Sequence, residues 1–296
     1  MNFKDKIFNT LIRAPFLGGY LREFQLRRKR PVEWALIRRR HQTANTHPSI
    51  LHFSVNKAAT QYVMDLLKRI GAANGMTPAH LHGYAFNSNF PFLDHLSAEE
   101  MQSYAYVFKP QGYAYTVFGG AIEGIPNMEA YRAVLMVRDP RDVLTSMYYS
   151  SAYSHAVPGA TGDKREDFLQ RRAHTREISI DQFVLENAER ERSIYQRYKD
   201  TLLDKYPGVY FTRYEEMTAD FDAWLTGLTT YCELEVSPAL RRAIYAEAEK
   251  IRPAKENIHA HVRKGQPGDY LNKLQPETIA RLNEIFAQTL KDYQYA

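Results

Sequence analysis

The chain has 296 residues, a net charge of +5, 44% hydrophobic residues and 25% charged residues, as is ordinary for a soluble globular protein. A chain of this length can bury a substantial core, in one large domain or in two smaller ones. A single cysteine, Cys232, excludes an internal disulfide framework and fits a reducing compartment. No apolar run approaches the roughly 20 residues of a membrane span, and no secretory signal is evident, so we expect a cytoplasmic protein.

The basic residues are concentrated at the N-terminus. Residues 1–40 contain eleven Lys or Arg and three Asp or Glu, whereas the rest of the chain contains 28 basic and 31 acidic residues. Apolar residues in this arm recur at roughly helical spacing, which permits an amphipathic helix on a membrane surface. We therefore divide the chain into a basic, partly helical arm over residues 1–45 and a single domain over residues 46–296. The arm either packs on the domain as a solvated surface or makes a peripheral contact with anionic lipid.

Strands alternate with helices along the domain. The β-prone runs predict strands at residues 50–55, 79–85, 104–109, 132–137 and 209–214. The helical patterns cover residues 60–70, 142–151, 180–206, 215–228, 238–251 and 276–293, and Gly71 is expected to end the first of them. This alternation predicts an α/β fold, a single domain with a central, mainly parallel sheet flanked by helices.

The first candidate site is a short loop of small residues between the first predicted strand and the helix after it. Lys57 lies in this loop and is followed by Ala58, Ala59 and Thr60. A helix N-terminus binds anions, because the free N–H groups of its first turn and its dipole favour negative charge. The loop is not a Walker A motif, which needs glycines before the lysine. It predicts a phosphate or sulfate site, or else a surface turn capped by Thr60.

The second candidate site follows the most apolar predicted strand. Arg138 comes at the end of that strand, and Asp139 and Pro140 suit the first positions of a helix. Asp142 is expected to complete the cap in the first turn, and Ser146 follows in the second turn. Arg138 and Ser146 can hold a phosphate at the carboxyl end of the strand. Alternatively, Arg138 forms a structural ion pair with Asp139 or Asp142.

Both segments resemble the nucleotide-binding motifs of sulfotransferases. In that family a loop of lysine, small residues and threonine binds a 5′-phosphosulfate, and an arginine and a serine eight residues later bind a 3′-phosphate. A third segment, VRKGQPGDYLN over residues 262–272, is similar to R-K-G-x-x-G-D-W-x-N of the cytosolic-type enzymes, with Tyr270 in place of tryptophan. The resemblance implies binding of 3′-phosphoadenosine 5′-phosphosulfate (PAPS). The residues it implies are Lys57, Ala58, Ala59, Thr60, Gln61, Tyr62, Arg138, Ser146, Tyr214, Arg263, Lys264 and Gly265.

The resemblance also implies the chemistry and two catalytic lysines. PAPS is the sulfuryl donor, and an acceptor oxygen or nitrogen attacks the sulfur in line. Lys57 would stabilise the negative charge that develops on the bridging oxygen. Lys109 matches a lysine at the end of the strand that precedes the 3′-phosphate segment in the cytosolic-type enzymes. No metal is expected, since the sequence has no cluster with metal-ligand spacing.

The general base is where this chain departs from the cytosolic-type pattern. Those enzymes carry K-T-H, with the histidine as base, where this chain has K-P-Q, and Gln111 cannot accept a proton. A carbohydrate-specific branch places a glutamate base about two dozen residues after the loop lysine, and that region of this chain contains His80 and His82. These histidines would share one face of the predicted strand, and we prefer His82. The other candidates are His155 and Glu123.

We therefore expect a PAPS-dependent sulfotransferase that acts on a hydroxyl or amine acceptor, which is a small molecule, a lipid or a carbohydrate. One alternative is a P-loop-type nucleotide kinase, although the Walker A glycines are missing. Another is a basic membrane-associated binding protein, which depends on the arm alone. The aromatic residues between positions 84 and 118 either line an acceptor pocket or belong to the core. Nucleic acid is not an expected partner.

Overall fold

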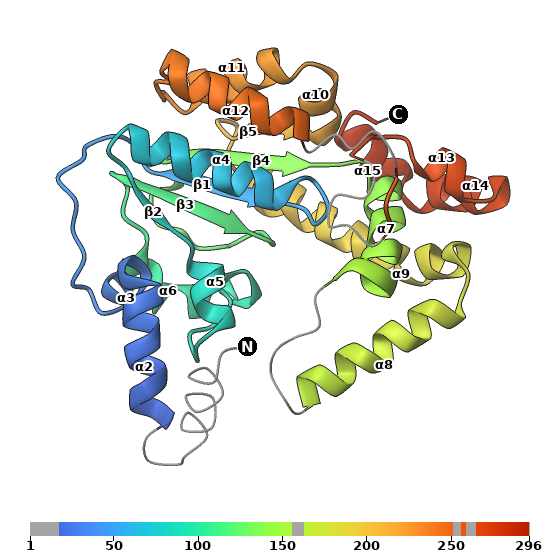
Figure 1. Cartoon of the computed structure of the whole chain (residues 1–296), viewed down its shortest axis with the longest axis horizontal. Helices are drawn as coiled ribbons and strands as arrows, with labels where there is room; N and C mark the ends of the chain where they lie inside the picture. Colours follow the sequence, from blue (N-terminus) through green and yellow to red (C-terminus); the bar gives the residue numbers. More distant parts are fainter. Residues whose placement is uncertain (1–17, 156–162, 251–255, 259–264, 296) are drawn as a thin grey trace. The chain divides into compact units, whose positions relative to one another are not determined.

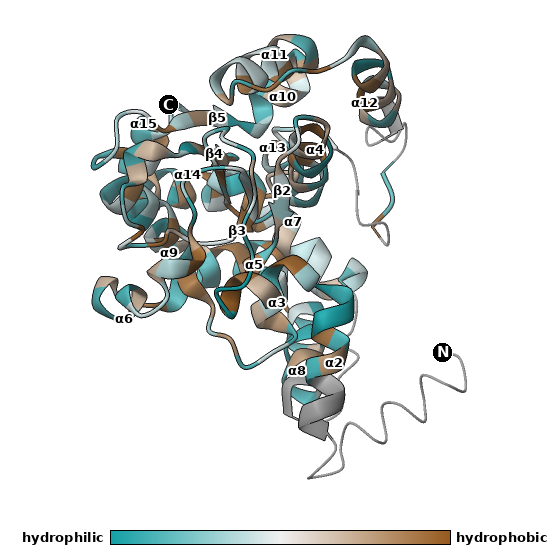
Figure 2. Cartoon of the chain, turned by 90° about the vertical axis from the view of Figure 1, so that its left-hand side faces the viewer, coloured by the Kyte–Doolittle hydropathy of each residue, from teal (hydrophilic) through white to brown (hydrophobic). Residues whose placement is uncertain are grey.

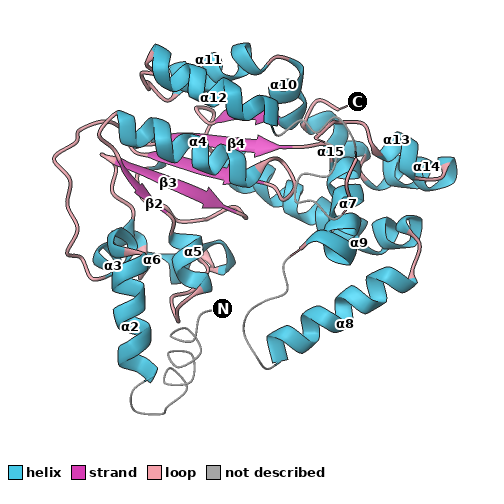
Figure 3. Ribbon diagram, viewed as in Figure 1, coloured by secondary structure: helices cyan, strands magenta, loops and turns pink. Residues whose placement is uncertain are grey.

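The computed structural model of the chain describes residues 18–155, 163–250, 256–258 and 265–295 (Figure 1). Helices surround the strands (Figure 3), which form one sheet in the order β2-β3-β1-β4-β5. The strands are β1 (Ile50–Ser54), β2 (Thr77–Ala79), β3 (Tyr113–Phe118), β4 (Arg132–Val137) and β5 (Tyr210–Arg213). The pairs β1–β3, β2–β3 and β4–β5 are parallel. The predicted α/β fold with a mainly parallel sheet is confirmed.

The chain divides into two compact units, Met1–Phe53 with Leu67–Ala133 and Ser54–Leu66 with Val134–Ala296. The first contains α2 (Gly18–Lys29), α3 (Pro31–Ile37), α5 (Leu81–Phe86), η1 (Leu93–His95), α6 (Ala98–Gln102), η2 (Ala105–Val107) and η3 (Met128–Ala130). The second contains α7 (Pro140–Tyr149), η4 (Ser150–Ser154), α8 (Asp163–Glu177), α9 (Ile180–Tyr198), η5 (Lys199–Leu203), α10 (Tyr214–Ala219), α11 (Phe221–Tyr231), α12 (Pro238–Lys250), α13 (Tyr270–Lys273), α14 (Pro276–Ile285) and α15 (Ala287–Asp292). Helix α4 (Thr60–Ala73) contributes residues to both units. The boundary at residue 45 remains a prediction.

Strands β1 and β3 form the buried centre of the first unit. Every residue of both strands is buried, as expected for parallel strands with both faces covered. His52 of β1 lies opposite Thr116 of β3. Neither ring nitrogen of His52 nor the Thr116 hydroxyl has a hydrogen-bond partner among the described residues. Burial lowers the pKa of His52 to about 3, so this imidazole is neutral in the core.

The strand predicted at residues 104–109 is wrong, because that run forms η2 and the strand begins after it. The Tyr115 hydroxyl donates a hydrogen bond to the Val107 carbonyl and accepts one from the Lys109 N–H, each at 2.8 Å. The apolar run therefore packs beside β3 instead of joining the sheet. Gly112, with a φ of 81°, turns the chain into β3, a conformation that glycine adopts at little cost.

The strand predicted at residues 79–85 is also wrong. Only Thr77–Ala79 pair in the sheet, and α5 follows directly. The backbone N–H of His80 donates to the Glu33 carboxylate at 2.7 Å, so the chain leaves the sheet ladder at this residue. His80 and His82 therefore do not share a strand face.

The starts and ends of α4 and α7 follow from local residues. The Asp139 side chain caps α7 by accepting the Arg141 N–H at 2.9 Å, and Pro140 is the first helical residue, as predicted. Helix α4 passes through Gly71, where it was expected to end, and continues to Ala73. A β-carbon on Gly71 would lie 3.2 Å from the Ala114 Cβ. The glycine therefore allows the end of α4 to pack closely against β3.

Helix α9 is the central helix of the second unit and packs against α7 and α14. Its buried cluster consists of Leu144, Phe183, Val184, Ala188, Tyr270, Leu274, Leu282, Phe286 and Leu290. The Tyr195 hydroxyl donates to the Arg138 carbonyl, and the Tyr293 hydroxyl donates to the Tyr195 carbonyl at 2.7 Å. These contacts fix the carboxyl end of β4, where Arg138 begins the second candidate site.

The described part of the basic arm forms α2 and α3 and then a non-helical segment over residues 38–45, and α3 packs against α2, β2, α5 and η2. The Trp34 indole donates to Glu23 at 2.6 Å. The guanidinium carbons of Arg27 and Arg38 lie 5.2 and 4.4 Å from the centroid of the Trp34 ring system. Part of the basic charge is therefore packed on the first unit, while α2 keeps a hydrophilic composition (Figure 2). The apolar residues at helical spacing fall within residues 1–17, outside the described part of the chain. No helix in the described part is long and apolar enough to cross a membrane.

Candidate functional site

The Lys57 loop joins the end of β1 to the start of α4. Lys57 and Ala59 have left-handed backbone conformations, with φ values of 63° and 54°, which cost about 1–2 kcal/mol per non-glycine residue. The Thr60 hydroxyl donates to the Val55 carbonyl at 3.1 Å and lies 3.0 Å from the Ser54 hydroxyl. Side chains therefore close the base of the loop while the backbone coils around the start of the helix. Strained loops of this kind are concentrated at functional sites, and a helix start offers N–H groups to an anion.

The Lys57 side chain is a half-buried cation. Within the described residues, its ammonium forms no hydrogen bond and no ion pair with a carboxylate. Burial, and to a smaller extent the positive charge of Arg138, lower the pKa of Lys57 to about 8. A bound anion would offset both effects, since an opposite charge favours the charged form of lysine.

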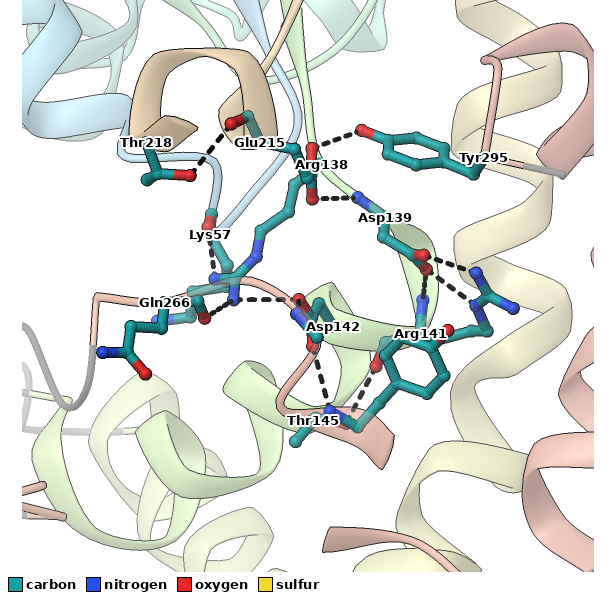
Figure 4. Close-up of polar contacts among 12 residues, drawn as sticks. Lys57, Arg138, Asp139, Arg141, Asp142, Thr145, Glu215, Thr218, Gln266 and Tyr295 are labelled. Carbon is teal, nitrogen blue, oxygen red and sulfur yellow. Dashed lines mark hydrogen bonds and ion pairs between the residues drawn. The ribbon is translucent and has the colours of Figure 1, made fainter. Parts of the chain in front are cut away.

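Arg138 lies beside this loop at the end of β4 and is 7% exposed (Figure 4). Its Nη1 donates to the Lys57 carbonyl at 3.1 Å, and its Nη2 donates to the Asp142 carboxylate and the Gln266 carbonyl at 3.3 Å each. The guanidinium carbon lies 4.5 Å from the centroid of the Tyr214 ring. The buried Nε has no hydrogen-bond partner among the described residues. Arg138 thus forms the ion pair that the sequence left open as an alternative, while its buried Nε–H is unused among the described residues.

Asp142 ties the C-terminal segment to this arginine. It is 1% exposed, and besides Arg138 it accepts the backbone N–H groups of Gly268 at 2.6 Å and Tyr270 at 3.0 Å. The expectation that Asp142 helps to cap its own helix is replaced by this longer-range role, because Asp139 provides the cap. Sequence reasoning missed the contact because the partners are 126 and 128 residues away.

A second buried ion pair supports the start of α7. Arg141 donates from its Nε and Nη2 to the Asp139 carboxylate at 2.9 and 2.6 Å, and its guanidinium carbon lies 4.4 Å from the Tyr270 ring centroid. The Asp139 N–H donates to Glu215 at 3.1 Å, and burial raises the pKa of Glu215. Asp139 is therefore paired with Arg141, and Arg138 is the cation that contacts the Lys57 loop.

The other residues implied for the 3′-phosphate are only partly described. Ser146 is half-buried on α7, two turns after the start of the helix. Gly265 has a φ of 65°, a left-handed conformation in which its amide can turn toward a ligand. Arg263 and Lys264 lie outside the described residues. Their assignment to the 3′-phosphate remains a prediction.

The residues implied for the adenine lie at the start of α4 and α10. The Tyr62 ring is half-buried and its centroid lies 6.1 Å from that of Phe221, which in turn lies 5.6 Å from that of Trp224. Gln61 is exposed, and Ala58 is fully buried. Sequence reasoning missed Phe221 because it carries no motif and is 159 residues from its aromatic partner. Tyr62 and Phe221 together provide aromatic surface beside the first turn of α4.

The strand end predicted at Lys109 is wrong. Lys109 precedes β3 and lies near the start of β1, since the Pro110 carbonyl accepts the Ser49 N–H at 2.8 Å. Strand β3, which comes before β4 along the chain, ends instead at Phe118. The catalytic role of Lys109 thus loses the strand end on which it rested, and it stays a prediction.

His80 is unsuited to the role of general base. Burial, followed by the positive charges of Lys68 and Arg30, lowers the pKa of His80 to about 3, so it binds a proton weakly at neutral pH. Its backbone is held by Glu33. Two alternatives from the sequence, His155 and Glu123, lie in loops, and the His155 ring centroid is 5.7 Å from that of Phe168.

His82 lies one residue into α5 and faces a carboxylate. Its Nδ1 is 3.9 Å from Oδ1 of Asp94, and its ring centroid is 4.8 Å from that of Phe92. Burial lowers the pKa of His82, the charge of Asp94 opposes this shift, and His95 adds to it. The imidazole is therefore neutral at neutral pH and can accept a proton. No group of three His, Cys, Asp or Glu side chains that could hold a metal occurs in the described part of the chain.

Comparisons with known proteins bear on the family and the fold of the chain. The family model for the sulfotransferase domain matches residues 127–294, and a search of curated proteins gave no significant match. Among solved structures, the chain is similar to mouse sulfotransferase SULT7A1 complexed with PAP, with 16% identity, a TM-score of 0.54, and coverage of 88% of this chain and 89% of that one. A retinol dehydratase in complex with androsterone and inactive cofactor PAP gives 15% identity, a TM-score of 0.46, and coverage of 82% and 81%.

Proposed function

This chain belongs to the sulfotransferase family and is a sulfuryl-transferring enzyme, and we propose that Lys57, Arg138 and their neighbours bind PAPS as its donor. The family match includes Arg138 and the C-terminal segment, whereas the Lys57 loop lies before it. The kinase alternative is set aside, because both the family and the missing Walker A glycines oppose it. The observation that carries the proposal is the half-buried Lys57 ammonium beside an arginine with one unused buried donor.

The residues present fit a doubly phosphorylated nucleotide. The left-handed Lys57 loop and the start of α4 suit the 5′-phosphosulfate, because both offer positive charge and N–H groups. Arg138 and Ser146 on α7 suit the 3′-phosphate, and the unused Nε–H of Arg138 is the donor that such a phosphate would satisfy. The aromatic pair of Tyr62 and Phe221 suits the adenine. The 3′-phosphate distinguishes this donor from ordinary adenine nucleotides.

The donor, when bound, supplies an electrophilic sulfur. The acceptor oxygen or nitrogen would form a bond to this sulfur while the bond between sulfur and the bridging oxygen breaks. The electron pair of the broken bond would stay on the bridging oxygen. In this proposal the Lys57 ammonium is next to that oxygen, and it would stabilise the developing charge in the transition state more than in the ground state, which accelerates the reaction. Because burial disfavours its own charge, Lys57 interacts strongly with any anion at this position.

The acceptor proton needs a base, and His82 is the residue we assign to that role. Its imidazole is neutral at neutral pH and can accept the proton of an acceptor hydroxyl or amine. Helix α5 brings the ring next to the residue that follows β3, since a β-carbon on Gly119 would lie 4.0 Å from its Cε1.

The proposed acceptor is a small molecule, lipid or carbohydrate with a free hydroxyl or amine. Half of the aromatic residues that were candidates for its pocket are buried in the core: Tyr84, Phe108, Tyr113, Tyr115 and Phe118. Near His82, however, Phe90 and Phe92 are only half-buried, and Phe86 is 71% exposed. These side chains favour an acceptor with an apolar part. The cytoplasm remains the proposed location, and the single cysteine, Cys232, is buried and forms no disulfide.

The experiment that tests the proposal is calorimetric titration with 3′-phosphoadenosine 5′-phosphate (PAP), with 5′-AMP and Mg-ATP as comparisons. We expect PAP to bind at least about tenfold more tightly than 5′-AMP, because one buried charge-assisted phosphate contact contributes about 1.5–3 kcal/mol. Preference for ATP, or equal affinity for PAP and 5′-AMP, would contradict the assignment of Arg138 to a 3′-phosphate.

A further inference from the structure

We propose that Asp94 is a positioning residue, which holds the Nδ1 edge of His82 so that its Nε2 takes the acceptor proton. This inference rests on the proposed function, in which His82 is the base. It adds a residue that no sequence motif indicates, because Asp94 lies in the short helix η1 within a polar and aromatic loop. The position of Asp94 also accounts for the glycine at residue 120, which follows β3.

The first observation is the orientation of the two side chains. Oδ1 of Asp94 faces Nδ1 of His82 at 3.9 Å, which is within ion-pair range and longer than a direct hydrogen bond. Phe92 packs against the same imidazole, at 4.8 Å between ring centroids, and the Asp94 residue is only 7% exposed. One ring nitrogen is thus directed to a buried carboxylate, and Nε2 is the nitrogen left to accept a proton.

The second observation is the absence of side chains at Gly119 and Gly120, which follow β3 directly. A β-carbon on Gly120 would lie 2.9 Å from Oδ2 and 3.0 Å from Cβ of Asp94, so any other residue would displace the carboxylate. A β-carbon on Gly119 would lie 4.0 Å from Cε1 of His82, an ordinary contact distance. Gly120 therefore leaves room for the Asp94 side chain at the carboxyl end of the strand, whereas a side chain would fit at Gly119.

The third observation is the charge around the imidazole. Asp94 and His95 face His82 from η1, and His80 lies two residues away at the start of α5. Among these groups, Asp94 is the single carboxylate within the described residues that raises the pKa of His82, while burial and His95 lower it. A base that gains a proton becomes an imidazolium, and Asp94 stabilises that charge where it forms, as the acid of a His–Asp pair does.

The test measures the protonation and tautomer of His82 directly in the full-length protein. The imidazole signals are followed by NMR against pH with labelled histidine, and His82 is assigned as the signal missing in His82→Gln. We expect Asp94→Asn to lower the pKa of His82 by about one unit and to shift its nitrogen signals away from the Nδ1–H tautomer. The matched control is Glu129→Gln, which removes an exposed carboxylate in the same unit. This variant should leave the pKa and the tautomer of His82 unchanged.

A second pair of variants tests the same idea without altering the carboxylate. Gly120→Ala should lower the pKa of His82, as Asp94→Asn does, whereas Gly119→Ala should leave this pKa unchanged. In transfer from PAPS to the probe acceptor 2-naphthol, Asp94→Asn should lower kcat more than it raises KM. The inference is overturned if the pKa and tautomer of His82 are the same in Asp94→Asn and the parent protein. Because these signals are read without nucleotide, that result is distinguishable from a failure of PAP to bind in the calorimetric test.

Discussion

Lys57 is the residue at which backbone strain and unbalanced charge meet. Its φ of 63° is unfavourable for any residue with a side chain, and its ammonium is half-buried next to another cation. Neither feature helps a protein to fold, and each is offset when an anion occupies the loop. At the residue scale, the clearest sign of function is therefore a local arrangement that costs stability in the absence of a ligand.

The protonation of Lys57 should control the affinity for PAP. Because the pKa of Lys57 is lowered to about 8, the ammonium is present below that pH and is lost as the pH rises through it. The terminal phosphate of PAP carries its full negative charge in this pH range. The affinity of the protein for PAP should therefore fall by up to about tenfold per pH unit above pH 8. The Lys57→Arg variant keeps its positive charge throughout this range, so its affinity for PAP should depend little on pH. Calorimetry at pH 7, 8 and 9 measures this, and an equal fall in both proteins would assign the titration to another group.

Asp142 should matter for folding as well as for binding. Removing its carboxylate leaves Arg138 without its ion-pair partner and leaves two backbone N–H groups without acceptors. We expect Asp142→Ala to lower the free energy of unfolding by about 3–5 kcal/mol, as for other broken buried pairs, and to weaken PAP binding. The control is Asp204→Ala, whose exposed pair with Lys199 should contribute about 0–1 kcal/mol. Urea unfolding compares the two, and similar losses would show that the Asp142 contacts are not special.

The elements that form the site differ in how far local sequence determines them. The start of α7 and the loop before α4 were predicted, because caps, small residues and the charge of a single lysine act over a few positions. The strand β3 was missed because its alternating tyrosines resemble a loop as much as a strand, and Tyr115 ties the preceding apolar run beside the sheet instead. The histidines at the start of α5 were assigned to a strand because their alternation mimics one, while the contact of His80 with Glu33 ends the strand pairing. Local residues thus predict where helices and loops begin, whereas long-range contacts decide which β-prone run pairs in the sheet.

The proposed lipid contact of the N-terminal arm belongs to helix α2. Its exposed Arg27, Arg28 and Lys29 and the 60% exposed Phe24 suit anionic lipid, at about 1 kcal/mol per basic residue near the surface. Replacing the three basic residues by glutamine should weaken sedimentation with vesicles of phosphatidylserine and phosphatidylcholine at least tenfold, with no change in PAP affinity. Deletion of residues 1–40 is a poorer test, since it would remove Glu33. Equal sedimentation of both proteins would show that α2 does not bind lipid.

The stability of the whole molecule should fall in acid because of one core residue. Unfolded His52 takes up a proton near its ordinary pKa of 6.5, whereas burial holds the folded pKa at about 3. The contribution of neutral His52 to the free energy of unfolding is therefore complete above pH 6.5. It falls by about 1.4 kcal/mol per pH unit between pH 6.5 and pH 3. His52→Phe removes this contribution, although His80, whose pKa is lowered to about 3, retains its own. Urea unfolding of the parent protein and of His52→Phe at pH 7 and pH 5 measures this effect. Equal losses of unfolding free energy in the two proteins would contradict the prediction.

Across the molecule, the α/β fold and the helix starts beside Lys57 and Arg138 could be predicted, but the contacts that connect these segments to the rest of the chain could not. The motifs around Lys57 and Arg138 each consist of neighbouring residues. The contacts of Asp142 with Gly268 and Tyr270, and of Tyr62 with Phe221, join positions more than 100 residues apart. Nothing in one sequence specifies such pairs, because they depend on how the helices pack.

The most direct test of the account is a crystal structure of the protein grown with PAP. We expect the 5′-phosphate against the Lys57 loop and the start of α4, and the 3′-phosphate within hydrogen-bond distance of the Arg138 Nε and the Ser146 hydroxyl. We also expect Lys57 and Ala59 to keep their left-handed conformations. A nucleotide bound elsewhere, or a 3′-phosphate that does not contact Arg138, would contradict the central claim that these two segments form the donor site.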